Sequence, residues 1–359
     1  MAVISTNQDK LVSHQVLTKF MREVFGRIKC APEVSEPVVQ GVVDTALRGV
    51  DTHAIRLLPR YIKEGQSGRV NLSPQMRITQ TLPTTALLDA DHTYGMHAAS
   101  FGMDHAIRMA EQYGMGSVAI YNSSHFGAAG IYALAAANRG FMGFSFTHGH
   151  PIVAPSGGSK ALIGTNPIAF AVPMEGEDPF CLDMATSGVP WNKVLQYRAE
   201  NAPLKPGWAV DREGKPTTDP HLACALLPIG DYKGYGLAMM VDILSALLTG
   251  MAFGPGVSGL YSPGEHQNIG HFVMAINISA FTPPAEFASR MKEMAEGLRS
   301  SPRANNDVPI LVANDPQKAT RAERLREGIP IPPPVVDDLK NLAMELGIDS
   351  NDYPSLLGT

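Results

Sequence analysis

Two short segments carry histidines in settings that could move a proton. The first, "DTHAIRLLPRYI" at 51–62, places Thr52 and His53 near an expected helix start, with Arg56 and Tyr61 close behind. A helix N-terminus attracts anions such as carboxylates, and an imidazole can give or take a proton near neutral pH. The ordinary alternative is that Thr52 only caps the helix and that His53 is a polar surface residue. Residue types alone leave both interpretations open.

The second segment is "YNSSHFGAAG" at 121–130, directly after an apolar run. Ser, Asn and Gly collect in ordinary turns, which is one explanation of this composition. The other explanation is that His125 reaches a ligand, with Phe126 as an apolar face and Gly127 allowing close approach of the backbone. Both explanations remain open at this point.

Composition narrows the class of protein. The chain has 359 residues, 44% hydrophobic and 18% charged, which is enough for one large or two ordinary domains with a buried core. A net charge of −5 without a dense Lys/Arg run gives no basis for a nucleic-acid partner. The start of the chain lacks a signal-peptide pattern, and three scattered cysteines fit a reducing cytoplasm. The most apolar stretch, 234–250, is expected to be a buried helix rather than a membrane span.

Hydrophobic periodicity predicts a helical start followed by an α/β region. Helices are expected over 10–30, 32–49 and 95–114, with a further one beginning within 51–65. Strands are expected over 85–91, 116–122, 140–147 and 167–173. The polar stretch 198–222 is predicted to be a surface loop, and the proline-rich tail from residue 328 a turn followed by a short final helix.

The usual fingerprint of dinucleotide binding occurs only in an unsuitable context. GxGxxG matches "GPGVSG" at 254–259, but a helix is expected before it and "LYSPGE" follows it. The mechanism requires a strand, a turn and then a helix whose N-terminus faces the pyrophosphate. No GxxxxGK[ST] loop occurs, and the absence of GxSxG weakens a serine-hydrolase interpretation.

Six ordered blocks together resemble the malate/L-lactate dehydrogenase family of the second, non-Rossmann type. They are "DTHAIRLLPRY" (51–61), "NSSHFGAAGIYA" (122–133), "GTNPIAFAVP" (164–173), "LDMATS" (182–187), "GWAVDREGKPTTDP" (207–220) and "YKGYGLAMMVDILSALLTG" (232–250). The resemblance spans residues 10 to 330 or so. The family includes sulfolactate and ureidoglycolate dehydrogenases, diketogulonate reductase and Δ1-piperideine-2-carboxylate reductases.

The resemblance implies an α/β fold: a mixed-sheet, non-Rossmann NAD(P)-binding domain with a helical domain built from the N-terminal and C-terminal segments. The expected division is a helical segment over 1–75, the cofactor-binding domain over 76–285, and a C-terminal segment over 286–359 that packs on the helical part. The resemblance also implies a homodimer with the active site near the subunit interface.

The same resemblance assigns roles to individual residues. His53, paired with Thr52, falls on the family's proton donor or acceptor; His125 is the alternative base, and Asp183 could share in proton transfer. Thr165 falls where the family touches substrate. Further substrate contacts are expected from Arg56 and Tyr61, which follow His53 in the chain, and from His148, which lies in a segment that departs from the family. Cofactor contacts fall on His125, Phe126, Gly127, Asp183, Met184, Ala185, Lys193, Tyr232, Lys233, Asn314 and Asp315.

Some positions depart from the family pattern. The family's arginine four residues after the histidine is Leu57 here, and Arg56 stands one step earlier. One residue is a rotation of about 100° on a helix. "HGHP" at 148–151 replaces the family's Asn-Ser, and Ala313-Asn314-Asp315 replaces Pro-Gly-Glu. These departures keep the class and leave the substrate open.

The leading hypothesis is an NAD(P)-dependent oxidoreductase that moves a hydride between nicotinamide and a small 2-hydroxy or 2-oxo acid, with either NAD or NADP and without a metal. One alternative is an NADPH-dependent reductase of cyclic 2-imino acids. A metal-dependent hydrolase or lyase using His125, His148, His150 and Asp183 belongs to a different class. A binding module without catalysis is the third possibility.

Overall fold

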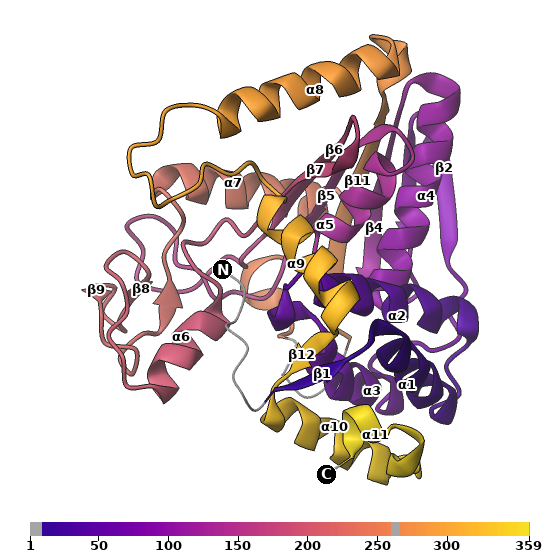
Figure 1. Ribbon diagram of the computed structural model, residues 1–359, viewed down its shortest axis with the longest axis vertical. Coiled ribbons are helices and arrows are strands. Elements are labelled where there is room, and N and C mark those ends of the chain that lie inside the picture. Colours follow the sequence, from indigo (N-terminus) through magenta and orange to yellow (C-terminus); the bar gives the residue numbers. More distant parts are fainter. Residues whose placement is uncertain (1–8, 260–265, 359) are drawn as a thin grey trace.

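A mixed seven-stranded sheet is the centre of the computed structural model, which describes residues 9–259 and 266–358 (Figure 1). Its strands, in spatial order, are β2 (Arg77–Leu82), β3 (Thr85–Asp89), β4 (Met115–Ser123), β11 (Ile269–Asn277), β5 (Phe141–Thr147), β6 (Ile168–Met174) and β7 (Glu177–Met184). Among these neighbours β3 and β4 pair in parallel and the others antiparallel. The predicted mixed-sheet α/β fold is therefore confirmed, and it differs from a doubly wound parallel sheet.

The central strand, β11, was not predicted from the sequence, and neither were β2 and β7. The four predicted strands are confirmed as β3, β4, β5 and β6. β11 pairs with β4 on one side and β5 on the other, so it joins segments more than 120 residues away in the chain. Its sequence, "IGHFVMAIN", contains a glycine and a buried histidine, and so it lacks a clean alternation of apolar and polar residues.

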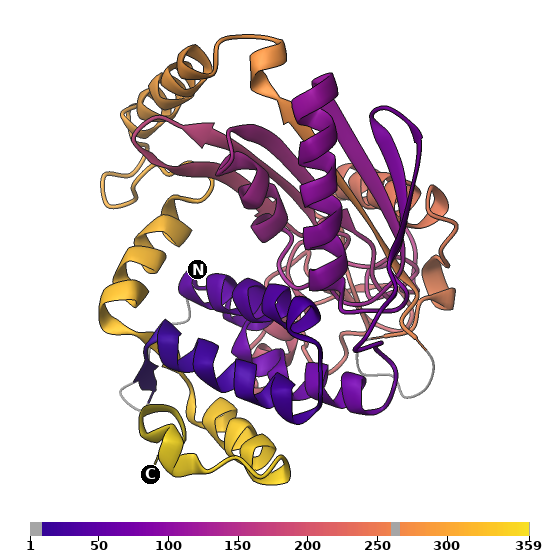
Figure 2. The same ribbon diagram turned by 90° about the vertical axis from the view of Figure 1, so that its right-hand side faces the viewer.

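Helices cover one face of the sheet and only part of the other. α4 (Gly95–Tyr113) and α5 (Gly130–Ala137) pack on one face (Figure 2). α7 (Tyr232–Asp242) and the π-helical turn η3 (Ile243–Leu247) approach the sheet elsewhere, at β4, β5 and β11. The expectation of a buried helix over 234–250 is wrong for the single chain, because the regular helix ends at Asp242 and Leu237, Leu247 and Leu248 are exposed. None of the described helices is both long and apolar enough to cross a membrane.

Segments from both ends of the chain form one helical unit (Figures 1 and 2). It contains β1 (Lys10–Val12), α1 (His14–Arg27), α2 (Pro32–Leu47), α3 (Leu58–Gln66), β12 (Ile329–Ile331), α10 (Pro333–Glu345) and α11 (Pro354–Leu357). Phe20, Val38, Leu339 and Tyr353 are buried in its shared core. Residues 10–12, predicted to begin the first helix, instead pair with β12 as a strand. The domain boundaries at 75 and 285 stay a prediction.

The stretch 198–222, predicted to be a surface loop, contributes to a small lobe. This lobe holds α6 (Trp191–Ala199) and three two-residue strands, β8 (Ala209–Val210), β9 (Pro216–Thr217) and β10 (Ala225–Leu226). Val153, Val194 and Leu226 are buried together in its core. Within 198–222 only residues 198–199, β8 and β9 are regular, and the rest is turns and irregular backbone that is mostly exposed, so the prediction of a surface loop is largely confirmed. The two-residue strands were not predicted, because strands this short give no periodic signal in the sequence.

The C-terminal part of the chain returns along the molecule to the helical unit. α8 (Pro284–Arg299) packs on β6, and α9 (Asp315–Glu327) leads back to β12. Neither helix is predicted from the sequence, and the tail forms two further helices where one is expected. Arg324 of α9 is buried and donates to both carboxylate oxygens of Asp51, at 2.6 and 2.9 Å. This ion pair fixes the turn that carries Thr52 and His53.

Candidate active site

The segment with Thr52 and His53 folds as two short 3-10 turns rather than as the start of a long helix. These are η1 (Asp51–His53) and η2 (Ile55–Leu57), and α3 begins only at Leu58. Neither turn shows a capping hydrogen bond from a side chain, so Thr52 is not a helix cap. Its hydroxyl instead lies 2.9 Å from Nδ1 of His53. That contact can set which ring nitrogen of His53 carries the proton.

The structure brings the two histidine segments together. His125 lies on the loop that follows β4, residues 124–129, which we call the His125 loop. Its ring stacks with that of His53, at 5.8 Å between centroids, and with that of Tyr61, at 6.0 Å. The hydroxyl of Tyr61 is 3.0 Å from Nδ1 of His125. His53, His125 and Tyr61 therefore form one cluster, the ring cluster.

Close backbone contact with α4 shapes the His125 loop. The N–H of Gly95, at the start of α4, donates to the hydroxyl of Ser124 at 3.0 Å. A Cβ at Gly95 would lie 2.1 Å from the carbonyl oxygen of Ser124, so only glycine fits. Gly127 has a φ of +76°, a conformation that favours glycine. Phe126 is buried, and its ring stacks on that of His271 of β11 with 4.7 Å between centroids, so it holds the loop against the sheet.

Desolvation keeps both histidines of the ring cluster neutral at pH 7. It lowers the pKa of His53 to about 4, with the charge of Arg56 adding to the effect. The pKa of His125 is lowered to about 3 by burial and by its neighbours His53 and His150. A neutral imidazole can accept a proton from a hydroxyl group, which is what a general base must do.

Asp183 stands at the end of β7, next to the His125 loop. One of its carboxylate oxygens accepts the N–H of Gly130, the first residue of α5, at 2.8 Å. Desolvation by the surrounding protein raises the pKa of Asp183 to about 6, although the side chain keeps contact with solvent and the bond to Gly130 acts in the opposite direction. A carboxyl group with this pKa can exchange a proton near neutral pH.

The predicted substrate contacts lie in different environments. Arg56 is exposed on η2, one residue from buried Leu57. Thr165 is half-buried, and its carbonyl oxygen accepts two hydrogen bonds from Thr186. His148 is buried, and its Nε2 accepts the N–H of Gly270 at 3.1 Å. Their roles as substrate ligands stay predictions.

The predicted cofactor contacts fall into two groups. Met184 and Ala185 follow Asp183 and are half-buried, and Thr186 pairs through its backbone with Ile229 just before α7. The loop before α7 is thereby joined to the loop that leads to α6 and Lys193. Tyr232 and Lys233, in the first turn of α7, are both exposed.

Asn314 and Asp315 lie near the opposite end of β7, and their side chains have partners within the protein. Asp315 binds Arg299 at 2.6 Å, and Asn314 donates to the carbonyl oxygen of Pro179 at 2.8 Å. The structure does not bring these two residues to the ring cluster. Their contact with a cofactor stays a prediction.

The residues that the sequence analysis missed are Gln267, Glu64 and Arg324. Gln267 accepts the backbone N–H of His125 at 2.8 Å and is itself held by Glu64. No local sequence pattern indicates these residues, because Gln267 is 142 positions from His125 in the chain. The nearest signal is a polar residue directly ahead of the run that forms β11.

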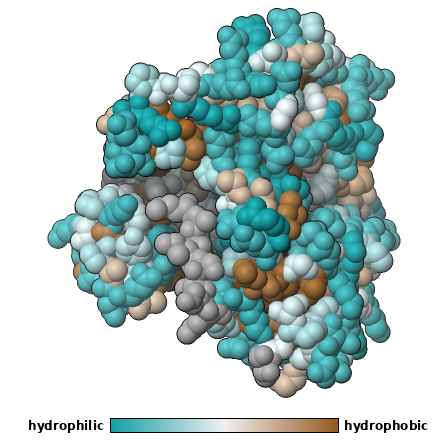
Figure 3. Space-filling view, in the orientation of Figure 1, coloured by the Kyte–Doolittle hydropathy of each residue, from teal (hydrophilic) through white to brown (hydrophobic). Residues whose placement is uncertain are grey.

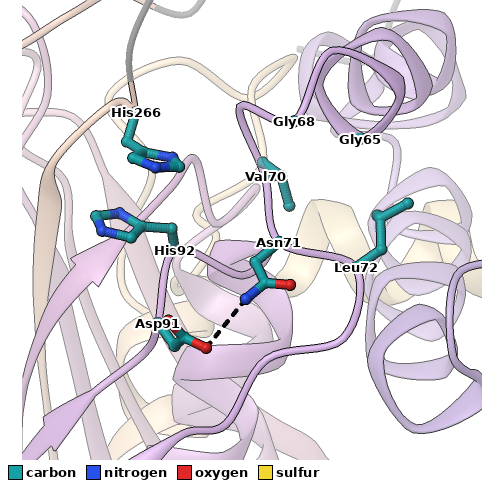
Figure 4. Close-up of a pocket in the computed structure, with 8 residues that line it drawn as sticks. All are labelled: Gly65, Gly68, Val70, Asn71, Leu72, Asp91, His92 and His266. Atoms are coloured by element: carbon teal, nitrogen blue, oxygen red, sulfur yellow. Dashed lines mark hydrogen bonds between the residues drawn. The ribbon is translucent and has the colours of Figure 1, made fainter.

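Two other features lie outside the ring cluster. The "GPGVSG" segment begins with a 3-10 turn, and its Ser258 and Gly259 accept hydrogen bonds from Arg69; residues 260–265 lie outside the described residues. A cavity of about 410 Å³ lies beside the end of α3 (Figure 4). It is lined by Gly65, Gly68, Val70, Asn71, Leu72, Asp91, His92 and His266, and so contains no member of the ring cluster. Within the part of the chain that the structure describes, no group of three His, Cys, Asp or Glu residues could hold a metal ion.

Comparisons with known proteins identify the family and confirm the fold. The family model for malate/L-lactate dehydrogenase matches residues 12–340. A malate dehydrogenase from Pyrococcus abyssi is 38% identical over 342 residues, covering 92% of this chain and 94% of that protein. The solved sulfolactate dehydrogenase of Methanocaldococcus jannaschii superposes with a TM-score of 0.91 at 33% identity, over 96% of this chain and 99% of that one.

A third similar structure is the Δ1-piperideine-2-carboxylate reductase from Pseudomonas syringae pvar. tomato. It has a TM-score of 0.83 at 28% identity, over 93% of this chain and all of that chain. Fold and comparisons together define the class of protein: this is an oxidoreductase of the hydroxy-acid dehydrogenase type. More particularly, the chain belongs to the malate/L-lactate dehydrogenase family.

The buried His148 should make stability depend on pH. Burial lowers the pKa of His148 to about 4 in the native protein, whereas an unfolded histidine titrates near about 6.5. Between these values the unfolded state binds more protons, so the free energy of unfolding falls as the pH falls. Gln does not titrate, and its amide oxygen can still accept the N–H of Gly270. From pH 7 to pH 5, His148→Gln should therefore lose about 2 kcal/mol less stability than the wild type in urea titrations.

The exposed His221 offers a matched control, and His221→Gln should follow the wild-type curve. If the free energy of unfolding of His148→Gln falls as steeply with pH as that of the wild type, the native state protonates His148 without a penalty, contrary to the prediction.

Proposed function

We propose that this protein transfers a hydride between a nicotinamide dinucleotide, NAD or NADP, and C2 of a small 2-hydroxy or 2-oxo acid in the cytoplasm. The ring cluster is the observation that carries the proposal, because it places a neutral proton acceptor, His53, against His125, whose ring also stacks with that of Tyr61. Membership of a dehydrogenase family supports the reaction type. The names of the relatives differ in substrate, and so the particular acid is left open.

In the oxidation direction, His53 takes the proton of the substrate hydroxyl group. When its Nδ1–H donates to the hydroxyl of Thr52, Nε2 presents the lone pair that accepts this proton. Arg56 is exposed beside the ring cluster, and its charge contributes to the lowered pKa of His53. The same charge attracts the substrate carboxylate. The bound dinucleotide supplies the hydride acceptor. In the reduction direction, the same imidazole returns the proton.

The residues near the end of β7 fit a nicotinamide dinucleotide. Asp183, Met184 and Ala185 offer a partly open strand end beside the His125 loop, where the positive φ of Gly127 lets backbone approach a flat ring. Lys193 and Lys233 lie in the first turns of α6 and α7, which follow the paired loops 186–188 and 227–229. Their amines suit a pyrophosphate.

We also propose that the protein is a homodimer. An apolar surface follows α7 and η3, and its exposed members are Tyr232, Leu237, Met239, Met240, Ile243, Leu247, Leu248 and Phe253. Part of it is visible as a brown area at the place of α7 (Figure 3). A contiguous patch of this kind marks an interaction surface. A second copy is the partner that the proposal assigns to it.

Dinucleotide binding tests the proposed function directly. The purified protein should bind NADH or NADPH in a calorimetric titration with a chelator present, and quenching of Trp191 and Trp208 should report the same event. Assays with 2-oxo acids and cyclic imines would then separate the hydroxy-acid reaction from the imino-acid alternative. The proposal fails if neither dinucleotide binds at millimolar concentration, or if the chelator abolishes turnover.

The two histidines should respond differently to truncation. His53→Ala should lower kcat by about 10²–10⁴-fold, the usual contribution of a general acid or base, and leave dinucleotide affinity nearly intact. His125→Ala should weaken dinucleotide binding instead, because it removes the ring beside the nicotinamide. If His125→Ala abolishes turnover with the dinucleotide still tightly bound, and His53→Ala stays active, then His125 carries the proton.

The proposed dimer should depend on the apolar surface of α7 and η3. Leu247→Glu places a charge on a side chain that is 54% exposed in the single chain, so it should convert a dimer to a monomer in sedimentation experiments without unfolding the protein. Leu82→Glu is the matched control on β2, where Leu82 is 62% exposed. A wild type that sediments as a monomer would remove this part of the proposal.

A further inference from the structure

We infer that Gln267 and Glu64 are positioning residues that hold His125 in place for the reaction. The inference rests on the proposed function for the role of His125 and on the hydrogen bonds around it for its physical content. The side-chain oxygen of Gln267 accepts the backbone N–H of His125 at 2.8 Å. The side-chain nitrogen of Gln267 donates to the carboxylate of Glu64 at 2.6 Å. Both side chains are buried.

Glu64 fixes the orientation of the Gln267 amide. An ionised carboxylate only accepts hydrogen bonds, so the amide nitrogen must face Glu64 and the amide oxygen must face the other way, toward His125. Arg60 and Arg69 pair with the same carboxylate oxygen, at 3.3 and 3.1 Å. Burial raises the pKa of Glu64, while these two arginines act against the rise. They thereby favour the ionised form that the arrangement requires.

Helix α3 holds His125 in two ways, once directly and once through Gln267. Tyr61 and Glu64 are three residues apart on α3 and so lie on the same side of it. Tyr61 contacts the ring of His125 directly, and Glu64 reaches its backbone through Gln267. The first contact limits rotation of the ring and the second limits movement of the loop. A site of this kind needs its groups held within about 0.5 Å, which two independent contacts achieve better than one.

The residue before Gln267 is anchored as well. Nδ1 of His266 lies 2.8 Å from the carbonyl oxygen of Arg69, and since a carbonyl can only accept, that nitrogen carries the proton. The ring of His266 stacks on that of His92 with 3.7 Å between centroids (Figure 4). The backbone that presents Gln267 is therefore fixed to the end of α3 and to the turn after β3. Movement of Gln267 would require breaking these contacts too.

A double-mutant cycle on dinucleotide affinity tests the inference. Gln267→Met keeps the length of the side chain and removes both hydrogen bonds, so it should raise the Kd for NADH or NADPH about 10-fold, a usual cost of losing a supporting contact. In the His125→Ala background the same change should alter Kd by less than about 2-fold, because the ring to be positioned is gone. Val38→Ala, which opens a cavity in the helical core, is the control for lost stability alone and should leave Kd unchanged.

A charge exchange provides the rescue. Gln267→Glu alone places two carboxylates in contact and should weaken binding at least as much as Gln267→Met. Glu64→Gln combined with Gln267→Glu restores one donor and one acceptor between the two side chains and keeps an oxygen toward the N–H of His125. Its Kd should return to within about 3-fold of the wild type.

The outcomes separate this inference from the proposed function. Equal effects of Gln267→Met with and without the ring of His125 would overturn the inference. If the wild type binds no dinucleotide, the proposed function fails. In that case NMR of the free protein tests whether Gln267 positions His125. The ring-to-ring nuclear Overhauser contact between Tyr61 and His125 should weaken in Gln267→Met and persist in the exchanged pair. An unchanged contact in Gln267→Met would overturn the inference.

Discussion

The contact between α3 and the His125 loop is the constraint on which the rest of the site depends. α3 belongs to the helical unit, whereas His125 follows a strand of the sheet, so the ring cluster exists only when the two units pack together. Tyr94 stabilises this packing: its hydroxyl donates to the carbonyl oxygen of Tyr61 at 2.6 Å, and its ring meets those of Tyr61 and Phe25 edge to face. Aromatic pairs of this kind contribute about 0.5–1.5 kcal/mol each beyond their buried area.

The buried histidines beneath the site are neutral at neutral pH. Desolvation lowers the pKa values of His53, His125, His148 and His271, so these rings are held as neutral donors and acceptors. The carboxylates that fix the site, Asp51 and Glu64, are paired with arginines. Charges interact strongly where water is excluded. Because both carboxylates are paired with arginines, neither presents an unpaired buried negative charge to a substrate carboxylate.

The sequence predicted the parts of the molecule that follow from local pattern and resemblance. The helices over 32–47 and 95–113 and the four strands belong to this group. The resemblance also assigned His53 and His125 to one expected site, without predicting that their rings stack. It did not predict the contacts that join distant segments, such as Glu64 with Gln267, 203 positions apart, because one chain without relatives carries no signal of such pairs. The apolar stretch over 234–250 is expected from the sequence to be a buried helix. Hydropathy alone cannot distinguish a side chain that is buried within its own chain from one that is exposed on the surface for a partner.

The departure at Arg56 and Leu57 has a physical explanation in the fold. Leu57 is buried in the helical core, so an arginine at that position could not keep its charge in water in this chain. Arg56 is exposed, yet its charge still reaches His53 and lowers the pKa of that imidazole. In the proposed reaction, a substrate carboxylate near Arg56 would offset this charge and raise the pKa of His53 from about 4 toward neutrality. A larger fraction of the imidazole would then carry the proton that the reduction direction requires when an acid is bound, which ties proton transfer to the class of substrate.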